Sequence, residues 1–425
     1  MTDVPVGERR QLPPPTSEGG AMGWLRQNLF SSWGNGITTV VLLLAIAWLL
    51  SWFVDWAVLT AVWTAPSGQD CRGHGACWAL IHEKYRYIFF GSFPYEQHWR
   101  PLFAVLAMLA MLILSADRRM WNKRLLWIWS IGSATTFLLM FGQINISSSL
   151  IFFLALVIGA GGAVLRATVG SPIEINAWRA LAGIGVAGLA LRLVGLFPAF
   201  TLSIAPFSYV ETSLWGGLPV TMILATYGLL FAFPLGILLA LGRRSNLPLI
   251  KSLCVGFIEL IRGVPLISLL IMASVMLPLF LPSGMTIDKF LRALVAVILF
   301  ASAYIAEVIR GGLQSLPKGQ FEAADAMGLT YFQKTTLVIL PQALRVVIPP
   351  LINTFIGFFK DTSLVLIIGI FDFLNTANQA LVDPKWAGFP GEIYLFAAFV
   401  YFCFCFSMSR YSKYLETELN KGTRR

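Results

Sequence analysis

A lysine, Lys360, lies within a long apolar run near the C-terminus, with polar residues directly after it and one to two helical turns before it. An ammonium group beside hydroxyl groups and backbone amides can receive a carboxylate through charge-assisted hydrogen bonds. This stretch therefore predicts a binding site for a solute that carries a carboxylate. Its candidate ligands are Lys360, Asp361, Thr362, Ser363, Thr354 and Asn353.

The same stretch has a second interpretation. Lys360 and Asp361, or Lys360 and an acid on another helix, could form an ion pair that only closes a helix bundle. Ionisable side chains at membrane depth are costly and usually face the interior of a bundle, which agrees with either interpretation. The sequence leaves both open.

Two acid–arginine pairs have the spacing i, i+3: Glu259 with Arg262, and Glu307 with Arg310. On a helix this spacing places both side chains on one face, where they can form an ion pair. Gly263-Val264-Pro265 follows Arg262 directly and should break the helix there. Each pair is either an anchor at the membrane surface or part of a gate or pathway wall.

A polar segment between two apolar runs, residues 317–341, predicts two short helices. Pro317 stands near the start of the first helix and Gly328 just past its end, the usual asymmetry of helix ends. A second helix is expected over Tyr331–Val338, ended by Leu340-Pro341. The pair is either a docking element or an ordinary loop. A face of small side chains and an acidic edge favour docking, and they are formed by Ala323, Ala324, Met327, Glu322 and Asp325.

The chain as a whole is too apolar for a soluble domain, with 57% hydrophobic residues, 12% charged residues and a mean hydropathy of +0.74. We expect an all-α polytopic membrane protein with about ten membrane-spanning helices. The net charge of +10 does not indicate nucleic-acid binding, because Lys and Arg lie in short loops between apolar runs. The expected spans cover roughly 37–58, 101–116, 125–141, 149–165, 180–197, 218–242, 263–281, 291–309, 346–368 and 393–409.

Most of the 31 Lys and Arg residues fall in alternate connecting segments. The positive-inside rule then places both termini and segment 317–341 in the cytoplasm. Residues 1–36 predict a disordered cytoplasmic tail, and residues 65–99 an outside loop. Cys71 and Cys77 lie in that loop, where a disulfide would persist, although two free thiols are an equal alternative.

Residues 322–341 resemble the EAA loop of ABC-importer permeases: Glu-Ala-Ala, three residues, Gly, nine residues, Ile, any residue, Leu-Pro. The one departure is Val338 in place of Ile. The stretches "ELIRGVPLI" (259–267) and "LPQALRVVIPPLINTFIGFFKDTSL" (340–364) are similar to permeases of polar-amino-acid importers, the histidine/glutamate/glutamine group. The matched positions are Glu322, Ala323, Ala324, Gly328, Leu340 and Pro341.

The resemblance covers about residues 207–425 and implies a type I importer permease core of about five helices in 206–425. Residues 37–205 look like the N-terminal extension, about five helices here, of larger permeases of general amino-acid uptake systems. The family also implies that a coupling helix within 317–341 docks on an ATPase subunit. The expected coupling residues are Glu322, Ala323, Ala324, Asp325, Gly328 and Pro341.

The chain contains no G-x-x-x-x-G-K-[ST] phosphate loop. ATP and Mg²⁺ are therefore expected on partner ATPase subunits, two in number, and no cofactor is expected on this chain. The resemblance further implies a bacterial inner (plasma) membrane, a periplasmic amino-acid-binding protein and a second homologous permease, in a heterodimer.

In this reading the substrate is an amino acid whose α-carboxylate lies at Lys360. Pro349-Pro350 and Gly357 would loosen the helix nearby, as is common at transporter substrate sites. Because Thr354 is neutral, the pocket has no obvious acid to select a basic side chain, which favours neutral or broad specificity for polar L-amino acids.

An intramembrane enzyme or a membrane scaffold is the competing class of function. The three histidines, His74, His82 and His98, all fall in the expected outside loop, and no nucleophile motif or paired carboxylates occur in the spans. His74 and His82 could ligate a metal together with Cys71 and Cys77, but a simple loop is the favoured interpretation. We therefore expect no metal site and no enzymatic activity.

Overall fold

The computed structural model describes residues 21–147, 175–193, 201–204, 206–280 and 287–420, together with positions 152, 155, 156 and 159. Contacts divide the chain into two compact units, Met1–His82 and Glu83–Arg425, each of which is described by itself. The predicted boundary near residue 205, between the N-terminal extension and the permease core, stays a prediction.

The first unit is built around one long helix. A short helix, α1 (Ala21–Asn28), precedes α2 (Trp33–Val54). Ser32 is the N-cap of α2, and its hydroxyl accepts a hydrogen bond from the Asn35 amide. The π-helical turn Asp55–Leu59 extends α2, so the apolar helix is 27 residues long. This length is enough to cross a bilayer. Helix α3 (Trp78–Phe90) contains the division between the units.

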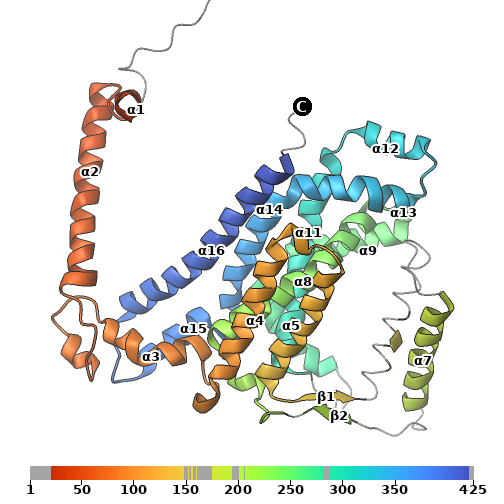
Figure 1. Ribbon diagram of the computed structural model, residues 1–425, viewed down its shortest axis with the longest axis horizontal. Helices are drawn as coiled ribbons and strands as arrows, with labels where there is room; N and C mark the ends of the chain where they lie inside the picture. Colours follow the sequence, from red (N-terminus) through yellow and green to blue (C-terminus); the bar gives the residue numbers. More distant parts are fainter. Residues whose placement is uncertain are drawn as a thin grey trace, which may run out of the picture. The chain divides into compact units, whose positions relative to one another are not determined.

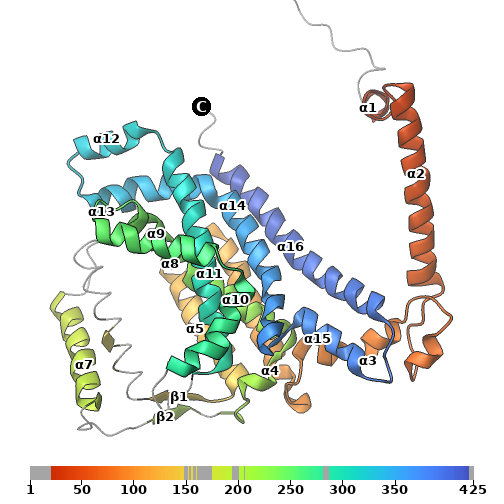
Figure 2. The same ribbon diagram turned by 180° about the vertical axis from the view of Figure 1, so that it is seen from behind.

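The second unit is a bundle of apolar helices, which Figures 1 and 2 show from two sides. In the described part of the chain, seven helical stretches are long and apolar enough to span a membrane, or eight when one bent pair is counted. One of the seven, Trp33–Leu59, belongs to the first unit, and the helix Ile175–Leu193 is not among them. The expected span 149–165 lies almost entirely outside the described residues, and the expected span 180–197 falls on α7 and on residues beyond it. The long helices of this unit are α4 (Trp99–Ala116), α5 (Lys123–Phe141), α7 (Ile175–Leu193), α8 (Gly217–Arg243), α11 (Lys289–Ser315), α14 (Leu340–Asp361) and α16 (Pro390–Asn420).

Strands are short and few among the described residues. β1 (Ile144–Ser147) pairs antiparallel with β2 (Thr201–Ile204), with Ile144 opposite Ile204. β3 (Phe371–Asp372) forms parallel bridges with Gly216 and Gly217. The architecture is all-α, as predicted.

Helices α8 and α11 form the centre of the bundle and lie side by side. Glycine permits this close approach: a Cβ on Gly236 would lie 2.6 Å from Ile305 Cγ2 and 3.1 Å from the Ser302 carbonyl oxygen. Between membrane helices, association depends on such close van der Waals packing.

The predicted break at Gly263-Val264-Pro265 is confirmed. Helix α9 (Pro248–Arg262) ends there, and α10 (Leu266–Ile271) continues through the turns Met272–Met276 and Leu277–Phe280 after a bend of 104°.

The segment between α11 and α14 partly follows the prediction. Helix α12 (Lys318–Ala326) begins after Pro317, and Gly328 follows it with a left-handed φ of +69°. The predicted end of the second helix at Leu340-Pro341 is wrong. Helix α13 (Tyr331–Gln333), the π-helical turn η8 (Lys334–Ile339) and α14 form one continuous helical run.

Local geometry explains why Pro341 does not end this run. Proline lacks an N–H, but it lies in the first turn of α14, directly after a π-helical turn that already changes the hydrogen-bond register. The Gln342 side-chain amide donates to the Val338 carbonyl at 2.9 Å and so satisfies an acceptor near the proline.

Candidate functional site

The predicted ligand stretch occupies the last two turns of α14 and the 3₁₀ turn η9 (Thr362–Ile368) that follows. Asn353 and Lys360 are exposed, and a Cβ on Gly357 would meet no atom within 4 Å. These positions are i, i+4 and i+7, so they lie along one face of the helix. The chain thus leaves a polar stripe uncovered on a helix long enough to span a membrane.

Lys360 has no carboxylate within ion-pair distance among the described residues, so it does not form the alternative pair with Asp361 within this chain. Asp361 is half-buried. Because Lys360 lies in the last turn of α14, its ammonium group also interacts favourably with the helix dipole.

The hydroxyl groups of the stretch bond to the backbone of their own helical segment. Thr354 donates to the Pro350 carbonyl at 2.8 Å, and Ser363 donates to the Lys360 carbonyl at 2.9 Å. Thr362 is 2% exposed and faces the bundle interior, away from the uncovered stripe. The structure therefore brings Asn353 and Lys360 together on one face, and not the whole predicted set.

The two predicted acid–arginine pairs belong to one charge network. Glu307 contacts Arg310, as predicted, and also Arg243 at 3.4 Å and Arg262 at 3.7 Å. The predicted pair of Glu259 with Arg262 is wrong: Glu259 pairs with Arg243 at 2.9 Å.

Arg243 at the end of α8 was not predicted, because its partners are separated from it by 16 and 64 residues. Only folding brings the ends of α8 and α9 against α11. Arg243 then takes the place of Arg262 as the partner of Glu259. Three helices meet at a single carboxylate.

Helix α12 is polar and presents most of its surface. Glu322, Ala323 and Asp325 are exposed, while Ala324 is 3% exposed and packs inward. Lys334 in η8 pairs with Asp325 at 2.5 Å. Exposed Met327 and Tyr331 extend this surface to the next turn.

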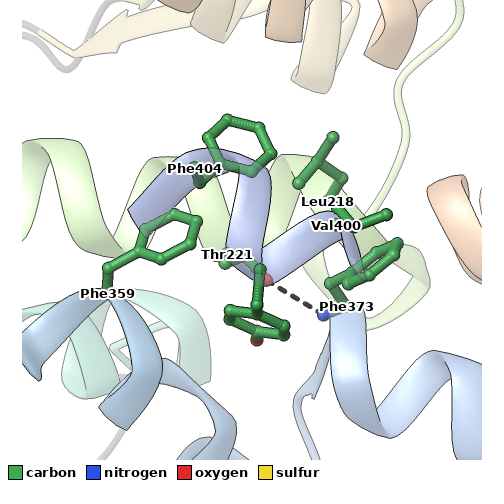
Figure 3. Close-up of a pocket in the computed structure, with 7 residues that line it drawn as sticks. Leu218, Thr221, Phe359, Phe373, Val400 and Phe404 are labelled. Atoms are coloured by element: carbon green, nitrogen blue, oxygen red, sulfur yellow. Dashed lines mark hydrogen bonds between the residues drawn. The ribbon is translucent and has the colours of Figure 1, made fainter. Parts of the chain in front are cut away.

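A pocket between α8, α14, α16 and the short helix α15 (Phe373–Gln379) has a mainly aromatic lining (Figure 3). Thr221 Oγ1 accepts a hydrogen bond from the Phe373 amide at 2.9 Å, drawn as a dashed line in the figure. The Tyr401 hydroxyl donates to Asp372 at 2.9 Å. Because both polar groups of the lining are engaged, the pocket offers nothing that would receive a charged solute.

In the first unit, Cys71 and Cys77 form a disulfide with a Cα–Cα distance of 5.6 Å. Trp78 Nε1 donates to the Ala57 carbonyl at 2.7 Å and ties the loop to the end of the long helix. Among the described residues, no group of three or more His, Cys, Asp or Glu side chains could hold a metal ion.

In the second unit, Lys84 of α3 lies 2.6 Å from Asp383, between α15 and α16. The Lys84 ammonium, assisted by the Lys385 backbone amide, holds the pKa of the Asp383 carboxyl below its ordinary value. This contact joins the segment that precedes α4 to the C-terminal helices.

Comparisons with known proteins identify the family of this chain. A family model described as "Binding-protein-dependent transport system inner membrane component" matches residues 232–421. The inner membrane amino-acid ABC transporter permease protein YhdY of Escherichia coli (strain K12) is 44% identical over 402 residues, 95% of this chain and 94% of that protein.

The glutamate/glutamine/aspartate/asparagine transport system permease protein BztC of Rhodobacter capsulatus is 40% identical over 97% of this chain and 96% of that protein. A solved structure described as "Crystal structure of an amino acid ABC transporter with histidines" is 31% identical, with a TM-score of 0.42, over 48% of this chain and 92% of that chain.

The chain belongs to the permease subunits of amino-acid ABC transporters. It is a multi-span membrane protein and a transport component rather than an enzyme, and the ATPase of such a transporter is a separate subunit. The predicted family, fold class and transport role are confirmed.

Proposed function

We propose that this chain carries polar L-amino acids across a bacterial inner membrane into the cytoplasm and that Lys360 receives the α-carboxylate of the substrate. The relative BztC is named as the permease of a glutamate/glutamine/aspartate/asparagine transport system, and these four amino acids all have an α-carboxylate. Binding through the shared group suits a permease with broad specificity for neutral and acidic polar amino acids.

The uncovered stripe Asn353, Gly357, Lys360 is the observation that carries this proposal. A charged side chain on a membrane-spanning helix is costly against lipid and normally faces protein or a water-filled pathway. Lys360 has no carboxylate partner among the described residues of its own chain. A carboxylate from outside the chain would satisfy it, and a substrate supplies one.

A second permease subunit is the protein that would cover this stripe. We propose a homologous but different chain, so that the pathway lies between unlike subunits. Two ATPase subunits would bind ATP and Mg²⁺ and dock on α12, through the exposed surface formed by Glu322, Ala323, Asp325 and Gly328, with Pro341 at the start of α14. Ala324, predicted as part of this surface, is buried and would support it from beneath. A periplasmic amino-acid-binding protein would deliver the substrate to the opposite end of the bundle.

The orientation that fits this scheme places both termini and α12 in the cytoplasm, as the distribution of Lys and Arg predicts. Residues 206–425 would form the permease core and residues 37–205 the extension. In this arrangement the charge network around Glu307 lies at the cytoplasmic end of the pathway, where we propose that it forms part of a gate.

The proposal is tested by uptake of radiolabelled amino acid into cells that express the complete transporter. Lys360→Met should raise the half-saturating substrate concentration at the membrane site about 10- to 150-fold, because it removes a charged hydrogen bond of roughly 1.5–3 kcal/mol. Lys360→Arg keeps the charge and should retain most of the uptake. Lys385→Met, at an exposed position outside the bundle, is the matched control and should behave as the wild type.

The structural alternative predicts a different result. If Lys360 only neutralises Asp361 in the assembled transporter, Lys360→Met should destabilise the complex, because it leaves a buried charge unpaired. The double variant Lys360→Met/Asp361→Asn should then restore uptake. Recovery in the double variant would refute the substrate role, whereas continued loss supports it.

A further inference from the structure

Asp372 is fully buried inside the helix bundle, at 0% exposure. It is the N-cap of α15 and accepts hydrogen bonds from the Asn375 amide at 3.1 Å and the Leu374 amide at 3.4 Å. The Tyr401 hydroxyl of α16 donates to its second oxygen at 2.9 Å. No cation lies within ion-pair distance of this carboxylate among the described residues, so hydrogen bonds alone compensate for its burial.

The side chain of Asn375 connects Asp372 to the candidate site. Its Nδ2 donates to Asp372 Oδ1 at 2.5 Å and to the Ser363 carbonyl at 2.7 Å, so both hydrogens of the amide group are used. The carboxylate also fixes the orientation of this amide, because a flipped side chain would point its oxygen at the negative charge. Asp372 therefore decides which group Asn375 presents to Ser363.

Ser363 in turn lies directly beside the lysine. Its hydroxyl donates to the Lys360 carbonyl, and its own carbonyl is held by Asn375. A continuous series of hydrogen bonds thus runs from Asp372 through Asn375 and Ser363 to the last turn of α14. Asp372, at the other end of the series, is held as well, because its backbone forms a parallel β-bridge with Gly217 at the start of α8.

Simple capping of α15 does not require an aspartate, because asparagine, serine and threonine cap helices about as well. Only a carboxylate accepts all of these donors at once without presenting a hydrogen to any of them. The buried carboxylate therefore matches its four donors, two of which belong to Asn375.

We propose that Asp372 and Asn375 are positioning residues for the Lys360 site, which hold the end of α14 in the orientation that presents the ammonium group to the substrate. This inference rests on the proposed function of Lys360. Neither residue touches the substrate in this scheme, and both act through the Ser363 carbonyl.

The test is a double-mutant cycle on the complete transporter, with the half-saturating substrate concentration and the amount of assembled complex measured for each variant. Asn375→Leu should raise the half-saturating concentration about 2- to 10-fold, the effect of one lost hydrogen bond. In the Lys360→Met background the same substitution should change it less than about 2-fold, because the group being positioned is gone. Asp372→Asn should behave like Asn375→Leu.

Tyr401→Phe is the matched control for stability. It removes a hydrogen bond from the same buried carboxylate but leaves the contact of Asn375 with Ser363 in place. It should lower the thermal midpoint of the complex while the half-saturating concentration stays within about 2-fold of wild type.

The outcomes separate the two proposals. An unchanged half-saturating concentration in Lys360→Met refutes the proposed function, and this inference with it. A large effect of Lys360→Met combined with an independent, additive effect of Asn375→Leu refutes only the positioning role. An effect of Tyr401→Phe as large as that of Asn375→Leu also refutes it, because general destabilisation then accounts for the loss.

Discussion

At the scale of single residues, Gly328 has a backbone angle that bears on the proposed docking surface. Its φ of +69° lies in the left-handed region, where an L side chain costs roughly 1–2 kcal/mol. Gly319, in the first turn of α12, has no such angle. A Cβ on either glycine would meet no atom within 4 Å, so the two positions differ in backbone strain and not in space.

We therefore expect Gly328→Ala to weaken ATPase binding and Gly319→Ala to leave it unchanged or slightly stronger, since alanine favours the helix. Co-purification of the ATPase subunit with the permease measures this, and hydrogen exchange over residues 318–328 reports the local strain. Equal effects of the two substitutions would show that the turn at Gly328 does not shape the docking surface.

Glu307 and Glu259 form a second matched pair, because both contact Arg243. The Glu307 side chain is 22% exposed and has three arginine partners, whereas the Glu259 side chain is 55% exposed. Screening by water makes an exposed pair weak, at most about 1 kcal/mol. Removal of Glu307 also leaves its arginines facing one another.

Glu307→Gln should lower the free energy of unfolding by roughly 1–3 kcal/mol, as expected for charged hydrogen bonds. Glu259→Gln should lower it by no more than about 1 kcal/mol. Thermal melts of the detergent-solubilised protein at low and high salt measure both. A larger loss for Glu259→Gln would mean that the network is not centred on Glu307.

At the scale of elements, α12 is connected to two long helices. Arg244 at the end of α8 donates to the Leu313 carbonyl of α11 at 3.1 Å and lies 5.2 Å from the centre of the Phe321 ring. Gln342 of α14 donates to Gln320 at 3.0 Å. A displacement of α12 by a docked subunit would therefore act directly on the end of α8 and on α14, which carries Lys360, and through Arg244 on α11, which carries Glu307.

Charge reversal on α12 should separate docking from folding. Glu322 is exposed and has no ion pair among the described residues, so we expect Glu322→Lys to reduce ATPase association and uptake while membrane insertion stays normal. Glu416→Lys, an exposed glutamate on α16, is the control for a change of net charge. Unchanged uptake in Glu322→Lys would refute the docking role of this edge.

At the scale of the whole molecule, the second unit leaves large apolar side chains exposed on several long helices. Phe399, Phe402 and Phe406 of α16 have exposed fractions of 64%, 61% and 52%, and they follow one another at helical spacing. Such a face suits lipid or another membrane helix and not water. It fits a subunit that works inside a bilayer.

The orientation of the chain is tested by cysteine labelling in a background that lacks the native free cysteines Cys254, Cys403 and Cys405. Lys334→Cys, next to α12, should react only with a reagent that enters the cytoplasm. Lys385→Cys, between α15 and α16, should react with a reagent that cannot cross the membrane. The reverse pattern would refute the charge-based topology and the coupling role with it.

Sequence alone determined the features that depend on composition and on local chain chemistry. Apolar runs predicted an all-α membrane protein, and Pro317 and Gly328 predicted both ends of α12, because these residues act on their own backbone. The break at Gly263-Val264-Pro265 was found for the same reason. The motif in 322–341 identified the family.

Tertiary structure decided the partners of the charged residues. Glu259 of α9 pairs with Arg243 at the end of α8 and not with Arg262, three residues further along its own helix. Folding places the Arg243 guanidinium 2.9 Å from the Glu259 carboxylate, and this contact replaces the local pair. The roles of Asp372 and Asn375 could not be predicted from the sequence, because an aspartate that caps a helix has the same local sequence pattern whether it is exposed or buried. Their link to Ser363 exists only because α15 packs against η9, the turn that follows α14, and contacts between separate elements cannot be read from local spacing.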